Sequence, residues 1–390
     1  MLSTATEPFI QKSEIFLETT GQARTTIARL ASVALVVVCA ASAMHSKRGK
    51  SSEGPGAEAF QLCKRCGDAR TGRMRGGLET PAVMLYTRRG FPAPLTLREL
   101  DALSIAVQDS PAPLGMQVSA AELLDEPGAG ILRKVPGGLK QFCGLHNRSD
   151  FLLLSARDSL TIQAGMPSSE GWTTLQTPAG QKKVTTAEYC DLVGAVQPDA
   201  ALCLTDEVFA DSNDKKLRKS VERSAVWTDE CLRARSNAGG QISPHTLLFA
   251  PIVGGWSERE RTNSAQEAGK RSLADGYAIL GLGCGESHEA RETLLKACLQ
   301  PLDASKPRYI SGLGSPDEVL WCAANGIDLI ESTYPAQAAA LGIALTFEVR
   351  YQELMSWQGN EVADNKEQVE MDERGARGGK LNLWDTGKIN

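Results

Sequence analysis

Four apolar runs of the chain end in residues whose types could do chemistry. The runs are AALCL, LLFAPIV, GYAILGL and IDLI, and the residues at their ends are Asp206-Glu207, Gly254-Gly255, Gly281–Glu286 (GLGCGE) and Glu331. Carboxylates that reach one cavity from separate strands are a frequent arrangement for a nucleophile and an acid/base pair. We therefore treat these four strand ends as candidate sites.

Each group also has a purely structural interpretation. Asp206 or Glu207 could cap the helix that follows, and the glycines could permit tight turns. GLGCGE has the spacing G-x-G-x-G, lacks the third glycine of the dinucleotide fingerprint, and lies late in the chain. Nucleotide binding through this segment is therefore disfavoured.

Composition excludes several classes of protein. The 390 residues are 42% hydrophobic and 23% charged, which is typical of a soluble globular chain and not of a disordered or fibrous one. A formal charge of −5 gives no overall basic field for a polyanion, so contact with nucleic acid requires a local patch or a partner. Ten cysteines are too few for a disulfide scaffold and favour a reducing compartment.

Metal ligands are sparse in the sequence. Cys63 and Cys66 form a CxxC, but no second pair follows at zinc-ribbon spacing. The histidines share no ligand spacing; they are His45, His146, His245 and His288. The residues alone predict no metal site.

Short apolar runs alternate with helical segments from Leu78 onward, which predicts a parallel α/β fold. Helix start signals are the capping boxes Thr96–Glu99 and Thr185–Glu188, Ser257, and Ser315-Pro316; Lys215–Arg235 is the longest expected helix. About eight strands over this length favour a (β/α)8 TIM barrel over a doubly wound sheet. The expected strands are Ala82–Tyr86, Phe151–Ser155, Ala200–Leu204, Leu247–Val253, Gly276–Leu282, Arg308–Gly312, Ile327–Ile330 and Ala344–Val349.

Three regions are expected. Residues 1–59 are expected to form an extension and linker that is disordered or tethers the chain to a membrane. They include the apolar run Ala31–Met44, which is shorter than a membrane span. Residues 60–350 would form the barrel. Residues 351–390 read as an acidic, flexible tail.

Several blocks in one order resemble the tRNA-guanine transglycosylase family. They are CLTDEV (Cys203–Val208), APIVGGW (Ala250–Trp256), DGYAILGLGCGES (Asp275–Ser287) and KPRYISGLGSPDEVLWCAANGIDLIESTYP (Lys306–Pro335). The resemblance runs from about Met84 to Val349 and implies a TIM barrel of the transglycosylase type. It also implies a base exchange in which queuine replaces guanine at the wobble position of tRNAs with GUN anticodons.

The chain departs from the family pattern at its chemical positions. Glu331 stands where catalytic members carry an Asp nucleophile, Val253 replaces a pocket glutamine, and Ser311 replaces a Met. Ala336-Gln337 replace Thr-Arg, and the S/T-D-S-G-G acid/base segment has no match between Gly128 and Phe151. These departures resemble the accessory, non-catalytic branch of the eukaryotic family. Further segments that resemble that branch are Gly77–Gly90, Lys219–Arg233 and Ala344–Glu348.

The resemblance implies that Glu331 is a degenerate nucleophile position and that the chain has no catalytic residue of its own. The remnant of the substrate pocket would comprise Asp206, Gly254, Gly255, Gly281 and Glu286. The family's zinc motif C-x-C-x-x-C with a later His is absent, so we expect no metal or cofactor and a chain shortened before the zinc-binding subdomain.

The implied partners are the catalytic queuine tRNA-ribosyltransferase subunit, as a heterodimer, and tRNA through that complex. Lys215–Lys219 or Arg88-Arg89 could contact phosphates, although a solvated helix start is the simpler interpretation of the first. The expected location is cytoplasmic, with peripheral association at the outer mitochondrial membrane.

Two alternatives remain open. The chain could be an active transglycosylase in which Glu331 is the nucleophile and Asp206 holds the base. It could instead be an unrelated TIM-barrel enzyme in which GLGCGE cradles a phosphorylated metabolite.

Overall fold

The computed structural model describes residues 59–92, 95–101, 113–161, 166–236, 239–345 and 380–382. The chain divides into two compact units, of which the larger, Lys47–Ala93 with Ala112–Thr333, contains the candidate strand ends. The extension, apart from its last residue, and most of the acidic tail lie outside the described residues, as does the run Ala31–Met44. Among the helices described, none is long and apolar enough to cross a membrane.

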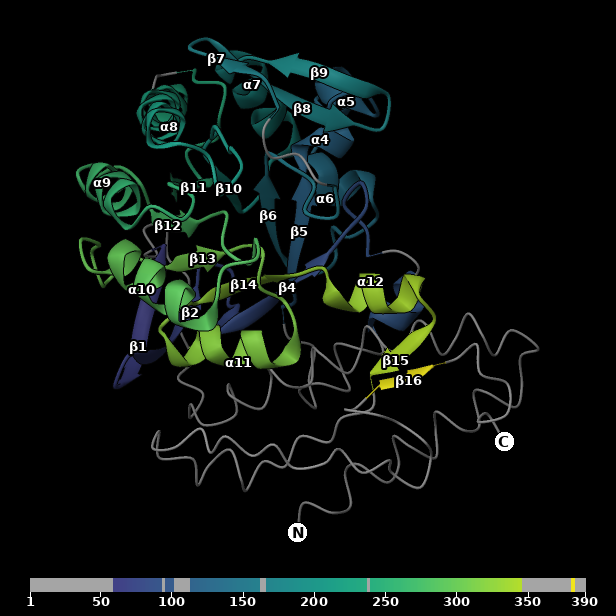
Figure 1. Ribbon diagram of the computed structural model, residues 1–390. Helices are drawn as coiled ribbons and strands as arrows, with labels where there is room; N and C mark the ends of the chain where they lie inside the picture. Colours follow the sequence, from purple (N-terminus) through teal and green to yellow (C-terminus); the bar gives the residue numbers. More distant parts are fainter. Residues whose placement is uncertain are drawn as a thin grey trace. The chain divides into compact units, whose positions relative to one another are not determined.

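Eight parallel strands close into a barrel, which confirms the expected (β/α)8 class (Figure 1). The barrel is sealed where the last strand pairs with the first, placing Glu331 opposite Met84. The strands are β4 (Ala82–Tyr86), β5 (Gly115–Ser119), β6 (Phe151–Ser155), β10 (Ala200–Leu202), β11 (Leu247–Ile252), β12 (Gly276–Ile279), β13 (Arg308–Ile310) and β14 (Leu329–Ser332).

Helices follow the strands and pack outside the barrel (Figure 1). The start signals hold: Thr185 forms a capping box with Glu188, and Ser257 and Ser315 are N-caps. The helices of the larger unit are α4 (Ala120–Leu123), α5 (Gly128–Leu132), α6 (Gly138–Phe142), α7 (Thr186–Val196), α8 (Asp214–Ser236), α9 (Glu258–Gly269), α10 (His288–Leu299) and α11 (Pro316–Ala324).

One of the expected strands lies outside the barrel. Ala344–Val349 was expected to complete the barrel, but the described part belongs to β15 (Ile343–Leu345), which pairs antiparallel with β16 (Lys380–Asn382). Both belong to the smaller unit, with α12 (Tyr334–Ala340). The barrel strand that the sequence did not predict is β5, whose sequence GMQVS contains no continuous apolar run.

The amino end of the barrel is covered by an antiparallel sheet of β1 (Phe60–Cys66), β2 (Ala69–Met74) and β3 (Glu79–Thr80). Arg70 on β2 forms a buried ion pair with Asp328, just before β14. It also donates to the carbonyls of Ala304 and Lys306 ahead of β13, both at 2.7 Å. These contacts leave the carboxyl end as the side on which chemistry can be built.

A second antiparallel sheet follows β6 and lies at the opposite end of the barrel from β1 (Figure 1). Its strands are β7 (Ser168–Ser169), β8 (Trp172–Thr177) and β9 (Gly180–Val184). The indole of Trp227 on α8 donates to the Glu170 carbonyl at 2.9 Å, which ties this sheet to the barrel's helical layer.

The barrel interior is apolar along most of its length. Its core side chains include Met84, Phe151, Leu153, Leu202, Phe249, Ala278 and Leu329. Two residues beyond Leu153 on β6 and Leu329 on β14, the same side of each strand carries Ser155 and Glu331, because side chains alternate along a strand. The interior therefore turns polar at the carboxyl end, which is the usual position of a site in this fold.

Candidate site at the carboxyl end of the barrel

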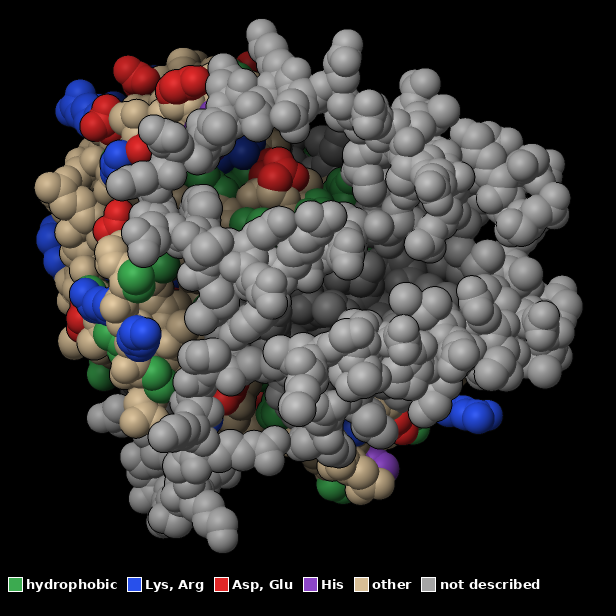
Figure 2. Space-filling view, turned by 90° about the horizontal axis from the view of Figure 1, so that it is seen from below, with side chains coloured by type: hydrophobic (Ala, Val, Ile, Leu, Met, Phe, Trp, Pro, Cys, Tyr) green, Lys and Arg blue, Asp and Glu red, His purple; other side chains and the backbone are tan. Residues whose placement is uncertain are grey.

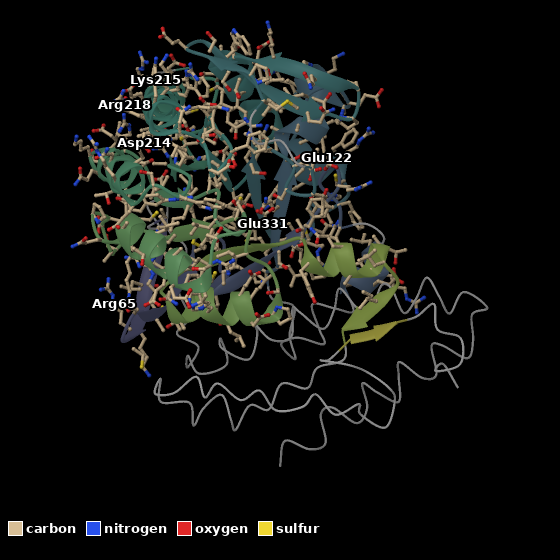
Figure 3. All side chains as sticks on the ribbon, viewed as in Figure 1. Arg65, Glu122, Asp214, Lys215, Arg218 and Glu331 are labelled. Carbon is tan, nitrogen blue, oxygen red and sulfur yellow. The ribbon has the colours of Figure 1, made fainter. Side chains whose placement is uncertain are left out.

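Glu331 is buried in a closed network of hydrogen bonds. Gln117 Nε2 on β5 donates to Glu331 Oε1 at 2.9 Å, and the Tyr309 hydroxyl on β13 lies 3.3 Å from Glu331 Oε2. The same hydroxyl lies 2.7 Å from Gln117 Oε1, so the three side chains join in a ring. Ser159, in the loop after β6, also bonds to Glu331. Figure 3 shows Glu331 near the centre of the barrel.

Burial favours a neutral Glu331. Burial raises its pKa from 4.5 to about 7, despite the hydrogen bonds from Ser159 and Tyr309. The single hydroxyl proton of Tyr309 serves Gln117 at the shorter distance. A protonated Glu331 can then donate to the Tyr309 oxygen, which satisfies every member of the ring. A neutral carboxyl is a poor nucleophile.

The serine hydroxyl of Ser155 lies 3.4 Å from Gln117 Nε2, at the last position of β6. The charge of Glu207 also acts on Glu331 and raises the Glu331 pKa further. Glu207 itself pairs with Arg157 at 3.3 Å. Among the contacts of Glu331 described here, none is to a carboxylate placed to exchange a proton with it.

Asp206, a second predicted site residue, is fully buried after β10. Its Oδ2 accepts from Arg223 Nη1 at 2.9 Å, and its backbone amide donates to the Ser224 hydroxyl, both on α8. Its Oδ1 has no hydrogen-bond partner among the described residues, although it is buried. Asp206 thus keeps one acceptor open and does not act only as a helix cap.

The predicted glycines Gly254 and Gly255 serve close approach of the backbone. A Cβ on Gly255, at φ +56°, would lie 2.4 Å from the Ala210 carbonyl, and one on Gly254 would lie 2.7 Å from the Arg261 amide. The fully buried Arg261 then donates to the carbonyls of Gly255, Leu280 and Gly281 at 2.8–2.9 Å. This arginine fixes the ends of β11 and β12 relative to each other.

Glu286 closes the GLGCGE loop on itself. Its carboxylate accepts from the amides of Gly283 and Cys284 at 2.6 and 2.8 Å and pairs with Arg291 at 2.8 Å. Burial raises the Glu286 pKa, but the Arg291 bond and these amides outweigh it, so the net shift is downward. The amides that a phosphate would need are therefore occupied by a carboxylate of the same loop.

Sequence reasoning missed a group of polar residues at the mouth. Tyr86 at the end of β4 donates to Asp158, after β6, at 2.9 Å. Glu122 accepts from the Arg89 amide at 2.9 Å, and burial and Asp158 raise its pKa. The acid/base segment was expected between Gly128 and Phe151, whereas Asp158 lies seven residues beyond Phe151, past the end of a strand that was correctly predicted. Gln117 and Tyr309 were missed for a different reason: they lie inside strands, whereas the candidates were chosen at strand ends.

The predicted phosphate contacts are exposed. Lys215, Lys216, Arg218 and Lys219 open α8, and Lys215 and Arg218 lie at the outer edge of the barrel, apart from Glu331 (Figure 3). Arg88 and Arg89 are also exposed. The described surface seen from below mixes both charge signs and shows no large area of one sign (Figure 2).

The residues do not fit a zinc centre of the kind that the family implies. The sequence has no Cys after Cys322 and no His after His288. In the described part of the chain, no three His, Cys, Asp or Glu side chains are placed to hold a metal ion. Cys63 and Cys66 are both exposed on β1.

A closed eight-stranded barrel with buried carboxylates at its carboxyl end defines the class as a TIM-barrel protein with a polar mouth. The family described as queuine tRNA-ribosyltransferase matches residues 62–387. The chain therefore belongs to the queuine tRNA-ribosyltransferase family.

Three relatives show the range of similarity. The chain is 31% identical over 280 residues to "Queuine tRNA-ribosyltransferase accessory subunit 2" of Homo sapiens, a match that covers 70% of this chain and 64% of the relative. The accessory subunit 2 of Danio rerio is 33% identical over 69% of this chain and 62% of its own length. A "Queuine tRNA-ribosyltransferase" of Halalkalibacterium halodurans is 28% identical over 74% and 73%. The matches thus span less than two thirds of either accessory subunit.

Proposed function

We propose that this chain is the non-catalytic subunit of a queuine tRNA-ribosyltransferase complex. Its partner would be the catalytic subunit, in a heterodimer that replaces guanine by queuine at the wobble position of the tRNAs for Asp, Asn, His and Tyr. Relatives that carry the name accessory subunit 2 support this role. The proposed location is the cytoplasm, with peripheral attachment to the outer mitochondrial membrane.

The observation that carries the proposal is the state of Glu331. In a base exchange, a carboxylate must attack the anomeric carbon of the ribose. Glu331 is buried and held by Gln117 and Tyr309, and its pKa of about 7 leaves much of it neutral. A side chain engaged on both oxygens cannot reach a ribose without breaking this ring. Misplacing a reacting group by about an ångström costs on the order of 10²-fold in rate.

The strongest competing function is an active transglycosylase. A carboxyl with a pKa near 7 also suits a general acid, and Asp206 Oδ1 offers an open acceptor for a base. The test is a measurement of guanine-for-queuine exchange into tRNA with this chain alone, with the catalytic subunit alone, and with both together. Activity that needs the mixture and persists in Glu331→Gln supports the accessory role. Activity of this chain alone that disappears in Glu331→Gln establishes Glu331 as a nucleophile and refutes our proposal.

A matched control separates an effect at Glu331 from a general effect of removing a carboxylate. Glu289→Gln makes the same change on the exposed face of α10 and should leave exchange by the mixture unchanged. The phosphate-cradle alternative is tested separately. Because Glu286 occupies the amides of Gly283 and Cys284, millimolar inorganic phosphate should not raise the melting temperature, and a clear rise would restore that alternative.

A further inference from the structure

Two exposed aromatic rings flank the candidate site on neighbouring loops. Phe209 lies three residues after Asp206, and Trp256 directly follows Gly255. Their side chains are 49% and 44% exposed, although large aromatic side chains are usually buried. The Trp256 amide donates to the Ala210 carbonyl at 2.9 Å, so the two loops that carry the rings lie against each other.

A cation beside the Phe209 ring favours a ligand that combines flat rings with negative charge. Lys216 Nζ lies 5.9 Å from the centre of the Phe209 ring, within the range of a cation–π contact. Arg259, three residues after Trp256 in the sequence, is 82% exposed at its side chain, and its Nε lies 4.0 Å from Glu260 Oε1. An exposed ring beside an exposed cation offers a stacking surface together with a phosphate contact, which are the two elements of single-strand recognition.

The local charge indicates whether the bases or the phosphate backbone of a nucleic acid would make the main contact. Asp211 and Asp214 are exposed beside Lys215 and Lys216, and Glu222 lies 4.0 Å from Arg218. The acidic groups offset most of the basic charge, so this surface cannot hold a duplex by phosphate attraction alone. Stacking on the two rings must then supply most of the affinity.

We infer that Phe209 and Trp256 form a stacking platform for unpaired bases of an RNA loop at the rim of the barrel. The inference rests on the proposed function, which brings a tRNA to this subunit, and adds which residues of the subunit contact it. Stacking on an aromatic ring does not depend on the identity of the base, so the platform holds flanking nucleotides of any sequence. It therefore positions the loop without selecting the base to be exchanged.

Fluorescence anisotropy with a labelled synthetic anticodon stem–loop tests this platform, using the full chain mixed with the catalytic subunit. Phe209→Ala and Trp256→Ala should each weaken binding by about tenfold, and the double variant should weaken it by about a hundredfold. Phe209→Leu keeps an apolar side chain but removes the ring, and it should weaken binding as much as Phe209→Ala. Phe142→Ala on α6 removes a ring that is 48% exposed outside this rim and should leave binding within twofold.

The RNA supplies a second control. A hairpin whose loop residues lack bases should bind the unaltered complex weakly. Its affinity should match that of the normal hairpin for the double variant, and substituting Phe209 or Trp256 should not weaken it further. The inference fails if the ring variants bind as tightly as the unaltered complex, or if they lose the same factor on the abasic hairpin. If the unaltered mixture neither binds the hairpin nor exchanges the base, the proposed function fails as well. If the mixture exchanges the base but its binding of the hairpin does not depend on the two rings, only the stacking platform is refuted and the proposed function stands.

Discussion

At the residue scale, Glu331 shows how burial and a closed ring of hydrogen bonds act on one carboxyl group. Gln117 and Tyr309 satisfy both of its oxygens, and burial holds its pKa at about 7. The sequence identified Glu331 through its place after an apolar strand. It could not identify the ring, because the partners come from strands about 20 and 210 residues away and meet only when the barrel closes.

The raised pKa of Glu331 gives stability a defined pH dependence. Between about pH 4.5 and 7 the folded carboxyl is protonated while the unfolded one is ionised, so stability falls as pH rises through this window. The loss totals about 3 kcal/mol and levels off above pH 7. Glu331→Gln keeps a neutral side chain and should flatten this fall, as measured by urea unfolding from pH 4 to 8. Parallel profiles for the two proteins would contradict the assignment.

At the scale of elements, the site depends on strand ends fixed by one buried cation. Arg261 lies on α9, yet its fork reaches three carbonyls at the ends of β11 and β12. The order of strands and the helix start signals were predictable because apolar runs and capping residues are local signals. Strand β5 was missed because Gly115 and Gln117 are not apolar, so the strand has no continuous hydrophobic run.

The free energy of unfolding should depend on the shape of the Arg261 guanidinium group and not only on its charge. A lysine in its place has one ammonium group and cannot serve three separate carbonyls, so Arg261→Lys should lower the free energy of unfolding by about 2–4 kcal/mol. Arg259→Lys, two residues earlier and exposed, should change it by less than about 0.5 kcal/mol. Denaturant titration compares the two variants, and equal effects would show that the carbonyl contacts contribute little.

The capping box of α7 offers a test of a local signal that the sequence predicted correctly. Thr185 Oγ1 accepts from the Glu188 amide at 3.2 Å, and the Glu188 carboxylate accepts from the Thr185 amide at 2.9 Å. Thr185→Ala removes the first bond and should destabilise the protein by about 1 kcal/mol. Thermal unfolding measures the change, with Thr185→Ser as the variant that keeps the hydroxyl. A loss of the same size in both would assign it to packing of the methyl group.

At the scale of the whole molecule, the β1–β3 sheet and the barrel act as one body through a buried ion pair. Burial raises the Asp328 pKa, and the Arg70 guanidinium opposes this shift. Asp328 also accepts from the Arg308 amide at 2.6 Å, so it joins the sheet to two barrel strands. Neither residue stood out in the sequence, because a charge partner about 260 residues away leaves no local pattern.

Removing one member of this pair should cost far more than removing an exposed one. Arg70→Met or Asp328→Asn should each lower stability by about 3–5 kcal/mol, since each leaves a buried charge or polar group without its partner. The double variant should lose less than the two single losses combined. Arg73→Met, on the same strand but paired with the part-exposed Glu79, should cost at most about 1 kcal/mol. Additive losses in urea unfolding would show that the pair is not coupled.

The seam between β14 and β4 has a consequence for how the protein is made. It joins Glu331 to Met84, about 250 residues apart, so the barrel stays open until nearly all of the described strands have left the ribosome. At ordinary translation speed this lasts roughly 10–50 s, during which the edge of β4 is available to other chains. The strand that ends this exposure is the one that carries Glu331. Closure of the barrel and assembly of its polar mouth are thus a single late event in biosynthesis, and chaperone demand should fall when β14 emerges.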